Sequence, residues 1–188
     1  MGTGYHGGFG GTLGSTYEGD TRNASEESYS DRGIEIPENV RTLLEKLSHK
    51  GDYVTGKNTD YSMTDVSIMS KESKVEFAKV IIGDEAYLIR GDSKGAVIPA
   101  HILSAIEKKS GRLVFHSHPR NDDLIPSMRD REVLGRLKKL TGQQYSTIVT
   151  PNGRLSTFNE HGVIETGHIA NTLDDSHKKA LLELFGGK

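Results

Sequence analysis

The stretch 111–130 reads GRLVFHSHPRNDDLIPSMRD and joins a strand pattern to the start of a helix pattern. Residues 113–115 are an apolar run of strand-forming side chains, and Pro119 ends the run. Because side chains alternate along a strand, His116 and His118 are expected on the same face. Two imidazoles on one face can bind a single metal ion, so the stretch predicts a metal site.

The second half of this stretch can supply a carboxylate. Pro126 and Ser127 open a helical pattern that places Asp130 in its first turn. Two neutral imidazoles, one carboxylate and an open position for water are typical of catalytic zinc. The chain contains no cysteine, so zinc would have to be held by His and carboxylate. Asp122 and Asp123 are rival carboxylates in the loop.

These residues resemble the H-x-H-P and S-x-x-D signature of the JAMM (MPN+, Mov34/JAB-type) zinc metallopeptidases. In that family both histidines and the aspartate bind zinc. The resemblance therefore implies one Zn²⁺ per chain, held by His116, His118 and Asp130. It also implies that the hydroxyl of Ser127 donates to the oxyanion that forms during hydrolysis, while the same residue caps the helix.

The sequence departs from the usual family pattern at one point. The segment 119–129 is one residue longer than usual, and the extra residue falls in the loop before Ser127, where insertions are tolerated best. The spacing between Ser127 and Asp130 is kept. The resemblance covers roughly residues 75–165 and implies an MPN/JAB-like (cytidine-deaminase-like) architecture, with the metal at one edge of the sheet.

The family also has an upstream glutamate that polarises the water on the zinc. It lies at the start of a strand whose apolar run ends in glycine, and the segment EFAKVIIG at 76–83 is similar to this. The resemblance thus implies that Glu76 takes a proton from the attacking water and returns it to the leaving amine. Glu72 is the main rival for this role. Glu85 is a weaker one because it falls in an expected turn.

Hydrophobic periodicity predicts a mixed α/β (α+β) fold, with helices packed on a curved mixed β-sheet. Val133, Leu134, Leu137 and Leu140 are expected to be the inward face of the helix that follows Ser127. The expected strands are 76–82, 86–90, 112–116, 145–149, 155–158 and 163–165. One further helix is expected to begin at Pro37, and two others are expected to cover 99–109 and 174–185.

We expect three parts along the 188 residues. Residues 1–33 are rich in Gly and Ser and predict a flexible arm or linker. Residues 34–73 form an N-terminal helix and an irregular extension, in which the polar segment 51–73 favours an extended stretch or a short hairpin. Residues 74–188 form the metallopeptidase-like domain with a C-terminal helix.

Composition narrows the choice of partners. The formal net charge of −2 gives no reason to expect nucleic acid, and no apolar stretch is long enough for a membrane span. The N-terminus lacks the basic head and apolar core of a signal peptide. We expect a cytoplasmic protein, although secretion within a larger polypeptide or assembly is also compatible with these features.

The resulting hypothesis is a zinc metallopeptidase that hydrolyses a peptide or isopeptide bond in a peptide or protein-conjugate substrate. One alternative is a catalytically silent MPN-type scaffold for protein interactions, but such scaffolds usually lack the zinc ligands, and here all three are present. A metallophosphoesterase that uses His-x-His would need further Asp, His and Asn clusters, and the sequence offers none of suitable pattern.

Overall fold

The computed structural model of the chain describes residues 27–109 and 111–172. The expected helix at 174–185 and most of the expected arm lie outside this part. The helices are α1 (Glu38–Lys46), α2 (Met63–Ser73), α3 (Ala100–Lys108) and α4 (Met128–Thr141), with a short 3-10 helix η2 (Ile169–Thr172). The strands are β1 (Tyr53–Lys57), β2 (Phe77–Ile82), β3 (Glu85–Arg90), β4 (Arg112–Ser117), β5 (Ser146–Val149), β6 (Arg154–Asn159) and β7 (Gly162–His168).

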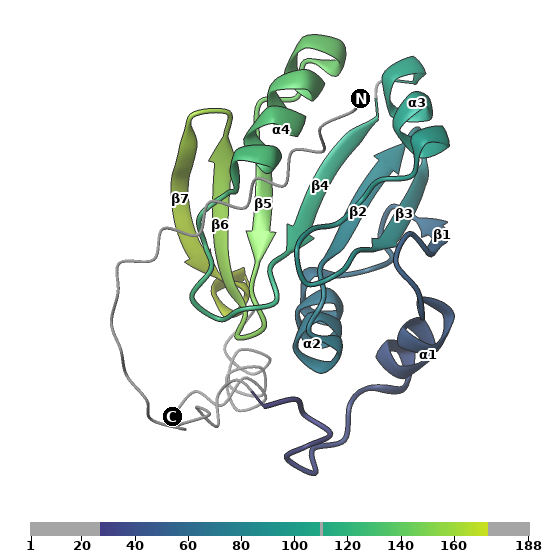
Figure 1. The fold of residues 1–188 in the computed structure, drawn as a ribbon, viewed down its shortest axis with the longest axis vertical. Helices are drawn as coiled ribbons and strands as arrows, with labels where there is room; N and C mark the ends of the chain where they lie inside the picture. Colours follow the sequence, from purple (N-terminus) through teal and green to yellow (C-terminus); the bar gives the residue numbers. More distant parts are fainter. Residues whose placement is uncertain (1–26, 110, 173–188) are drawn as a thin grey trace, which may run out of the picture.

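One mixed sheet organises the molecule, with strand order β1-β3-β2-β4-β5-β6-β7 (Figure 1). Every neighbouring pair is antiparallel except β4 and β5, which are parallel. A parallel pair needs a long crossover connection, and α4 lies in the one between β4 and β5. The prediction of a mixed sheet flanked by helices is confirmed, and β4, which carries the histidine pair, lies at its centre.

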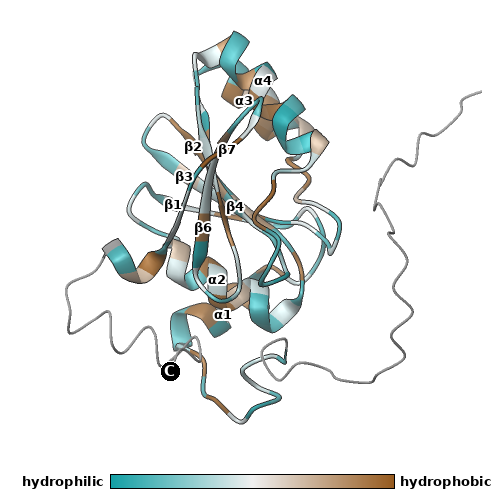
Figure 2. Ribbon diagram, turned by 90° about the vertical axis from the view of Figure 1, so that its left-hand side faces the viewer, coloured by the Kyte–Doolittle hydropathy of each residue, from teal (hydrophilic) through white to brown (hydrophobic). Residues whose placement is uncertain are grey.

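Helices pack against the sheet in two groups (Figure 2). Helices α1 and α2 share a core with Tyr29, Phe77 and Phe115, whereas α3 and α4 share another with Val80 and Leu113. In β4 the register shifts by one residue next to these side chains. This irregularity lets Leu113 and Phe115 pack into different cores despite their spacing of two. The extra residue of β4 is Val114, and regular pairing resumes at Phe115 and His116, so the histidines lie beyond the irregularity.

The segment 63–73 corrects one expectation. We expected an extended stretch or hairpin over 51–73, which is right for β1 but wrong for α2. Helix α2 lacks a clean apolar stripe, because polar side chains occupy some of its buried positions. The hydroxyls of Ser67 and Ser70 are satisfied there by donating to the carbonyls of Thr150 and Val75 at 2.7 and 2.8 Å.

Two further differences concern burial. Leu140 was expected to face inward, but it is 47% exposed, because the last turn of α4 extends beyond the strands that its first turns cover (Figure 1). Tyr29 falls within the stretch assigned to the flexible arm, yet it is fully buried in the core shared by α1 and α2. Among the described residues, no helix combines the length and the apolar character that a membrane span requires.

Candidate metal centre

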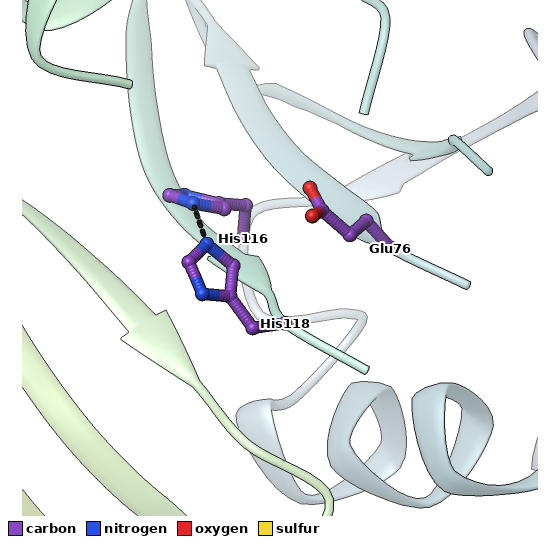
Figure 3. Close-up of side chains that lie close together, drawn as sticks. All are labelled: Glu76, His116 and His118. Carbon is purple, nitrogen blue, oxygen red and sulfur yellow. Dashed lines mark hydrogen bonds between the residues drawn. The ribbon is translucent and has the colours of Figure 1, made fainter. Parts of the chain in front are cut away.

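The two histidines converge at the end of β4. His116 is the last residue but one of the strand and His118 follows its end. Both are buried, and their Nε2 atoms lie 3.1 Å apart (Figure 3). The alternation of side chains along the strand therefore predicted the common face correctly.

Asp130 faces both rings from the first turn of α4. One of its carboxylate oxygens lies 3.5 Å from Nε2 of His116, and the other lies 3.6 Å from Nε2 of His118. Two ligands bonded to the same tetrahedral zinc ion are about 3.4 Å apart. The Nε2–Nε2 spacing of 3.1 Å is close to this value, and the distances of 3.5 and 3.6 Å, each to a different Asp130 oxygen, place this carboxylate beside the same pair. Two imidazoles and a carboxylate are donor types that zinc binds.

A capping box holds Asp130 in this position. The backbone N–H of Ser127 donates to the Asp130 carboxylate at 2.7 Å, and the Asp130 N–H donates to the Ser127 hydroxyl at 3.1 Å. The predicted capping role of Ser127 is confirmed. Its side chain also interacts with the Asp130 carboxylate and helps to lower the pKa of that group, so Ser127 lies directly beside the candidate ligand.

Asp123, considered above as a rival ligand, lies behind His118 instead. Its carbonyl oxygen is 2.9 Å from Nδ1 of His118 and its carboxylate is 3.4 Å from the same atom. A proton on Nδ1 would leave the lone pair of Nε2 for a metal, as is usual for metal-binding histidines. Burial alone would lower the pKa of His118, but hydrogen bonds with Asp123 and Asp130 outweigh it and raise the pKa to about 10.

These interactions also act on Asp130. Burial by itself would raise the pKa of the Asp130 carboxyl, but the rings of His116 and His118 and the cap at Ser127 outweigh it and lower the pKa. The carboxylate is therefore ionised, as a metal ligand must be. Because His118 is readily protonated in the metal-free site, metal binding there would release a proton.

Glu76 faces the histidines from the residue before β2 (Figure 3). It is 9% exposed, and its Oε2 accepts a hydrogen bond of 3.0 Å from the N–H of Ala96. Burial raises the pKa of this carboxyl above its usual value, although the two histidines oppose the shift. A raised pKa makes the carboxylate a better proton acceptor near neutral pH.

Glu76 is also close enough to be a metal ligand. One oxygen of Glu76 and one nitrogen each of His116 and His118 all lie within 4.8 Å of one another. The histidine pair therefore has two carboxylate neighbours, Asp130 and Glu76. The resemblance to the JAMM family implies that Asp130 is the ligand and Glu76 the base.

The remaining rival carboxylates point elsewhere. The side chain of Glu72 accepts a hydrogen bond from the backbone of Ser30. Glu85 is the first residue of β3 rather than part of a turn, and it pairs with Ile82 at the opposite end of β2 from Glu76. Asp122 forms an exposed ion pair with Arg120.

Gly91 supports Glu76, and sequence reasoning missed it. A Cβ atom at Gly91 would lie 2.3 Å from the carbonyl oxygen of Gly95 and 2.6 Å from Cα of Ala96. The N–H of Gly91 also donates to the Glu76 carbonyl at 2.7 Å. The close approach of these two backbone segments thus places the Ala96 N–H against the Glu76 side chain.

If Glu76 is the base that the JAMM resemblance implies, Gly91→Ala should lower the rate of hydrolysis by about tenfold to a hundredfold, since a displacement of about 1 Å at a reacting group can have this effect. The zinc content should not change. Gly167→Ala is the control, because no atom lies within 4 Å of the added Cβ there. Steady-state kinetics and elemental analysis of the purified variants test this prediction, and full activity in Gly91→Ala would contradict it.

Comparison of the whole chain with family models, curated proteins and solved structures finds no match in any of the three. We therefore infer the function from the geometry of His116, His118, Asp130, Glu76 and Ser127.

Proposed function

We propose that this protein is a zinc-dependent metallopeptidase of the JAMM type that hydrolyses a peptide or isopeptide bond. The observation that carries the proposal is the spacing of 3.1 to 3.6 Å among the Nε2 atoms of His116 and His118 and the carboxylate of Asp130. It is supported by the buried carboxylate of Glu76, which faces the same histidines but takes no part in the capping box of Ser127 and Asp130.

Each residue has a separate task in this proposal. His116, His118 and Asp130 hold the zinc ion. When bound, zinc polarises the scissile carbonyl and lowers the pKa of a water molecule to about 7. Glu76 takes the proton of the attacking water on Oε1, while the Ala96 N–H keeps Oε2 in place. The same carboxyl then gives the proton to the leaving amine, so that the amide C–N bond can break.

Ser127 acts on the other side of the scissile carbonyl. Its hydroxyl donates a hydrogen bond to the carbonyl oxygen as negative charge develops there. The N-cap position fixes the hydroxyl next to Asp130, because the Asp130 N–H donates to the same oxygen atom. A hydroxyl held in this way needs little reorganisation when the substrate reacts.

Metal removal and restoration test the proposal. The full chain should contain about one zinc ion and cleave members of a fluorescence-quenched peptide library or an ε-linked lysine conjugate. A chelator should abolish cleavage, and added Zn²⁺ should restore it. Elemental analysis and the appearance of new amino groups are the two measurements. A chain that binds no zinc when it is supplied would instead fit the catalytically silent scaffold.

A further inference from the structure

A cavity of about 300 Å³ lies beside the metal centre, between the end of α2 and the loop that follows β4. Its walls include the cationic side chains Lys71, Lys74 and Arg120, together with Ser93. No acidic residue belongs to the described residues that line it. Among the described residues, the charged side chains that line this concave site are all cationic.

Lys71 is the residue that most needs explanation. It is 2% exposed, and its ammonium lies 4.5 Å from the ring centre of Tyr29. No oxygen atom of the described residues accepts a hydrogen bond from this ammonium. Buried lysines almost always have an anionic or hydrogen-bonding partner, because an ammonium without one loses much of its solvation energy. A group that enters the cavity can supply that partner.

The surroundings of Lys71 are basic as well. Burial lowers the pKa of its ammonium, and the nearby charges of Arg32 and Lys74 lower it further. Arg120 is already paired with Asp122 at 3.4 Å, in an exposed ion pair that solvent weakens. An anion in the cavity would reduce the repulsion among the cations and give the Lys71 ammonium a partner of opposite charge.

The cavity is also within reach of a substrate bound at the metal centre. Arg120 follows the ligand His118 by two residues, so their Cα atoms are at most about 7.6 Å apart. The loop that begins at Pro119 thus has the cavity on one side, while Asp123 of the same loop contacts His118. A peptide whose scissile amide lies at the histidines can place a neighbouring group in the cavity.

We propose that this basic cavity binds a carboxylate of the substrate next to the scissile bond, with Lys71 as its principal partner. The proposal rests on the peptidase function proposed above, since peptide substrates bring carboxylates to this place. The carboxylate is either the C-terminal group of the peptide or the side chain of Asp or Glu. Lys71 and Arg120 would thereby determine specificity without taking part in the chemical step.

Direct binding tests the cavity independently of hydrolysis. The probes are N-acetyl-Ala-Ala with a free C-terminus, its C-terminal amide, N-acetyl-Glu amide and inorganic phosphate. Each is titrated into the ¹⁵N-labelled full chain, with and without zinc, and the amide signals of Ser93 and Arg120 are followed by NMR. We expect at least one carboxylate probe to shift these signals in both forms, and the neutral amide to leave them unchanged.

Variants then assign the effect to Lys71. Lys71→Met keeps the aliphatic stem over Tyr29 and should weaken carboxylate binding by about tenfold or more, the usual effect of losing a charged hydrogen bond. Lys139→Met removes one exposed charge from α4 and should bind as the parent does. If Lys71→Met does not fold, Arg120→Gln is measured in its place, with an expected loss of about threefold.

The outcomes are distinct from those of the peptidase test. Binding of N-acetyl-Ala-Ala would show that the cavity takes a C-terminal carboxylate, and binding of N-acetyl-Glu amide would show that it takes an acidic side chain. Unchanged binding in Lys71→Met and Arg120→Gln, or no shift with any carboxylate, overturns the proposal even if peptides are cleaved. Tighter binding of phosphate than of both carboxylates overturns the assignment of the ligand. Carboxylate binding without any hydrolysis supports the cavity and contradicts the peptidase function alone.

Discussion

Glu76→Gln is expected to keep the zinc content of the parent protein while lowering peptide hydrolysis by about a thousandfold. General acid–base catalysis contributes about 10² to 10⁴ to a rate, and the amide of glutamine cannot accept the proton of the attacking water. The substitution keeps the shape of the side chain, so the hydrogen bond from Ala96 to one terminal oxygen can remain. Elemental analysis and single-turnover kinetics with the best peptide give the two readouts.

Asp130→Asn and His118→Ala provide the contrast, because both should lose zinc along with activity. Glu72→Gln is the control for removing a nearby carboxylate, since Glu72 contacts the backbone of Ser30 rather than the histidines. Loss of zinc in Glu76→Gln, with zinc retained in Asp130→Asn, would exchange the two roles. Glu76 would then be the third ligand, in line with its distance of at most 4.8 Å from a nitrogen of each histidine.

The parts of the site that follow from local geometry could be predicted from sequence. Strand alternation places His116 and His118 on one face, and the spacing of Ser127 and Asp130 gives a capping box. Both rules involve residues that are close in the chain. Glu76 could be proposed only through the family resemblance, because nothing local indicates that β2 and β4 are neighbours in the sheet.

The supporting contacts have weaker sequence signals. Ala96 contributes a backbone N–H, which every non-proline residue has, and Gly91 acts by lacking a side chain. A conserved glycine in aligned relatives would have been the signal for the latter. Helix α2 was missed because its buried serines depend on acceptors far along the chain, such as the carbonyl of Thr150.

Ser127→Ala is expected to lower hydrolysis by about a hundredfold, and the protein offers a close internal control in Ser62→Ala. Both serines are N-caps of a capping box, with hydroxyl-to-backbone distances of 3.1 Å in each. Losing either cap should cost about 1 kcal/mol of stability. Their surroundings differ, because the carboxylate that Ser62 contacts is Asp65, at 2.6 Å, whereas the carboxylate beside Ser127 is Asp130, which faces His116 and His118.

This difference separates the two roles of Ser127. If its hydroxyl donates to the developing oxyanion, removing that donor should reduce kcat by about 10² to 10³, as is typical of oxyanion-hole donors. Ser62→Ala should then show the same loss of thermal stability with normal kinetics, and Ser127→Thr should keep most of the activity because it retains the hydroxyl. Equal kinetics in Ser127→Ala and Ser62→Ala would mean that Ser127 only caps α4. A slow Ser127→Ala with full zinc content would instead place the hydroxyl in contact with the reacting carbonyl, since its backbone N–H still holds the Asp130 carboxylate.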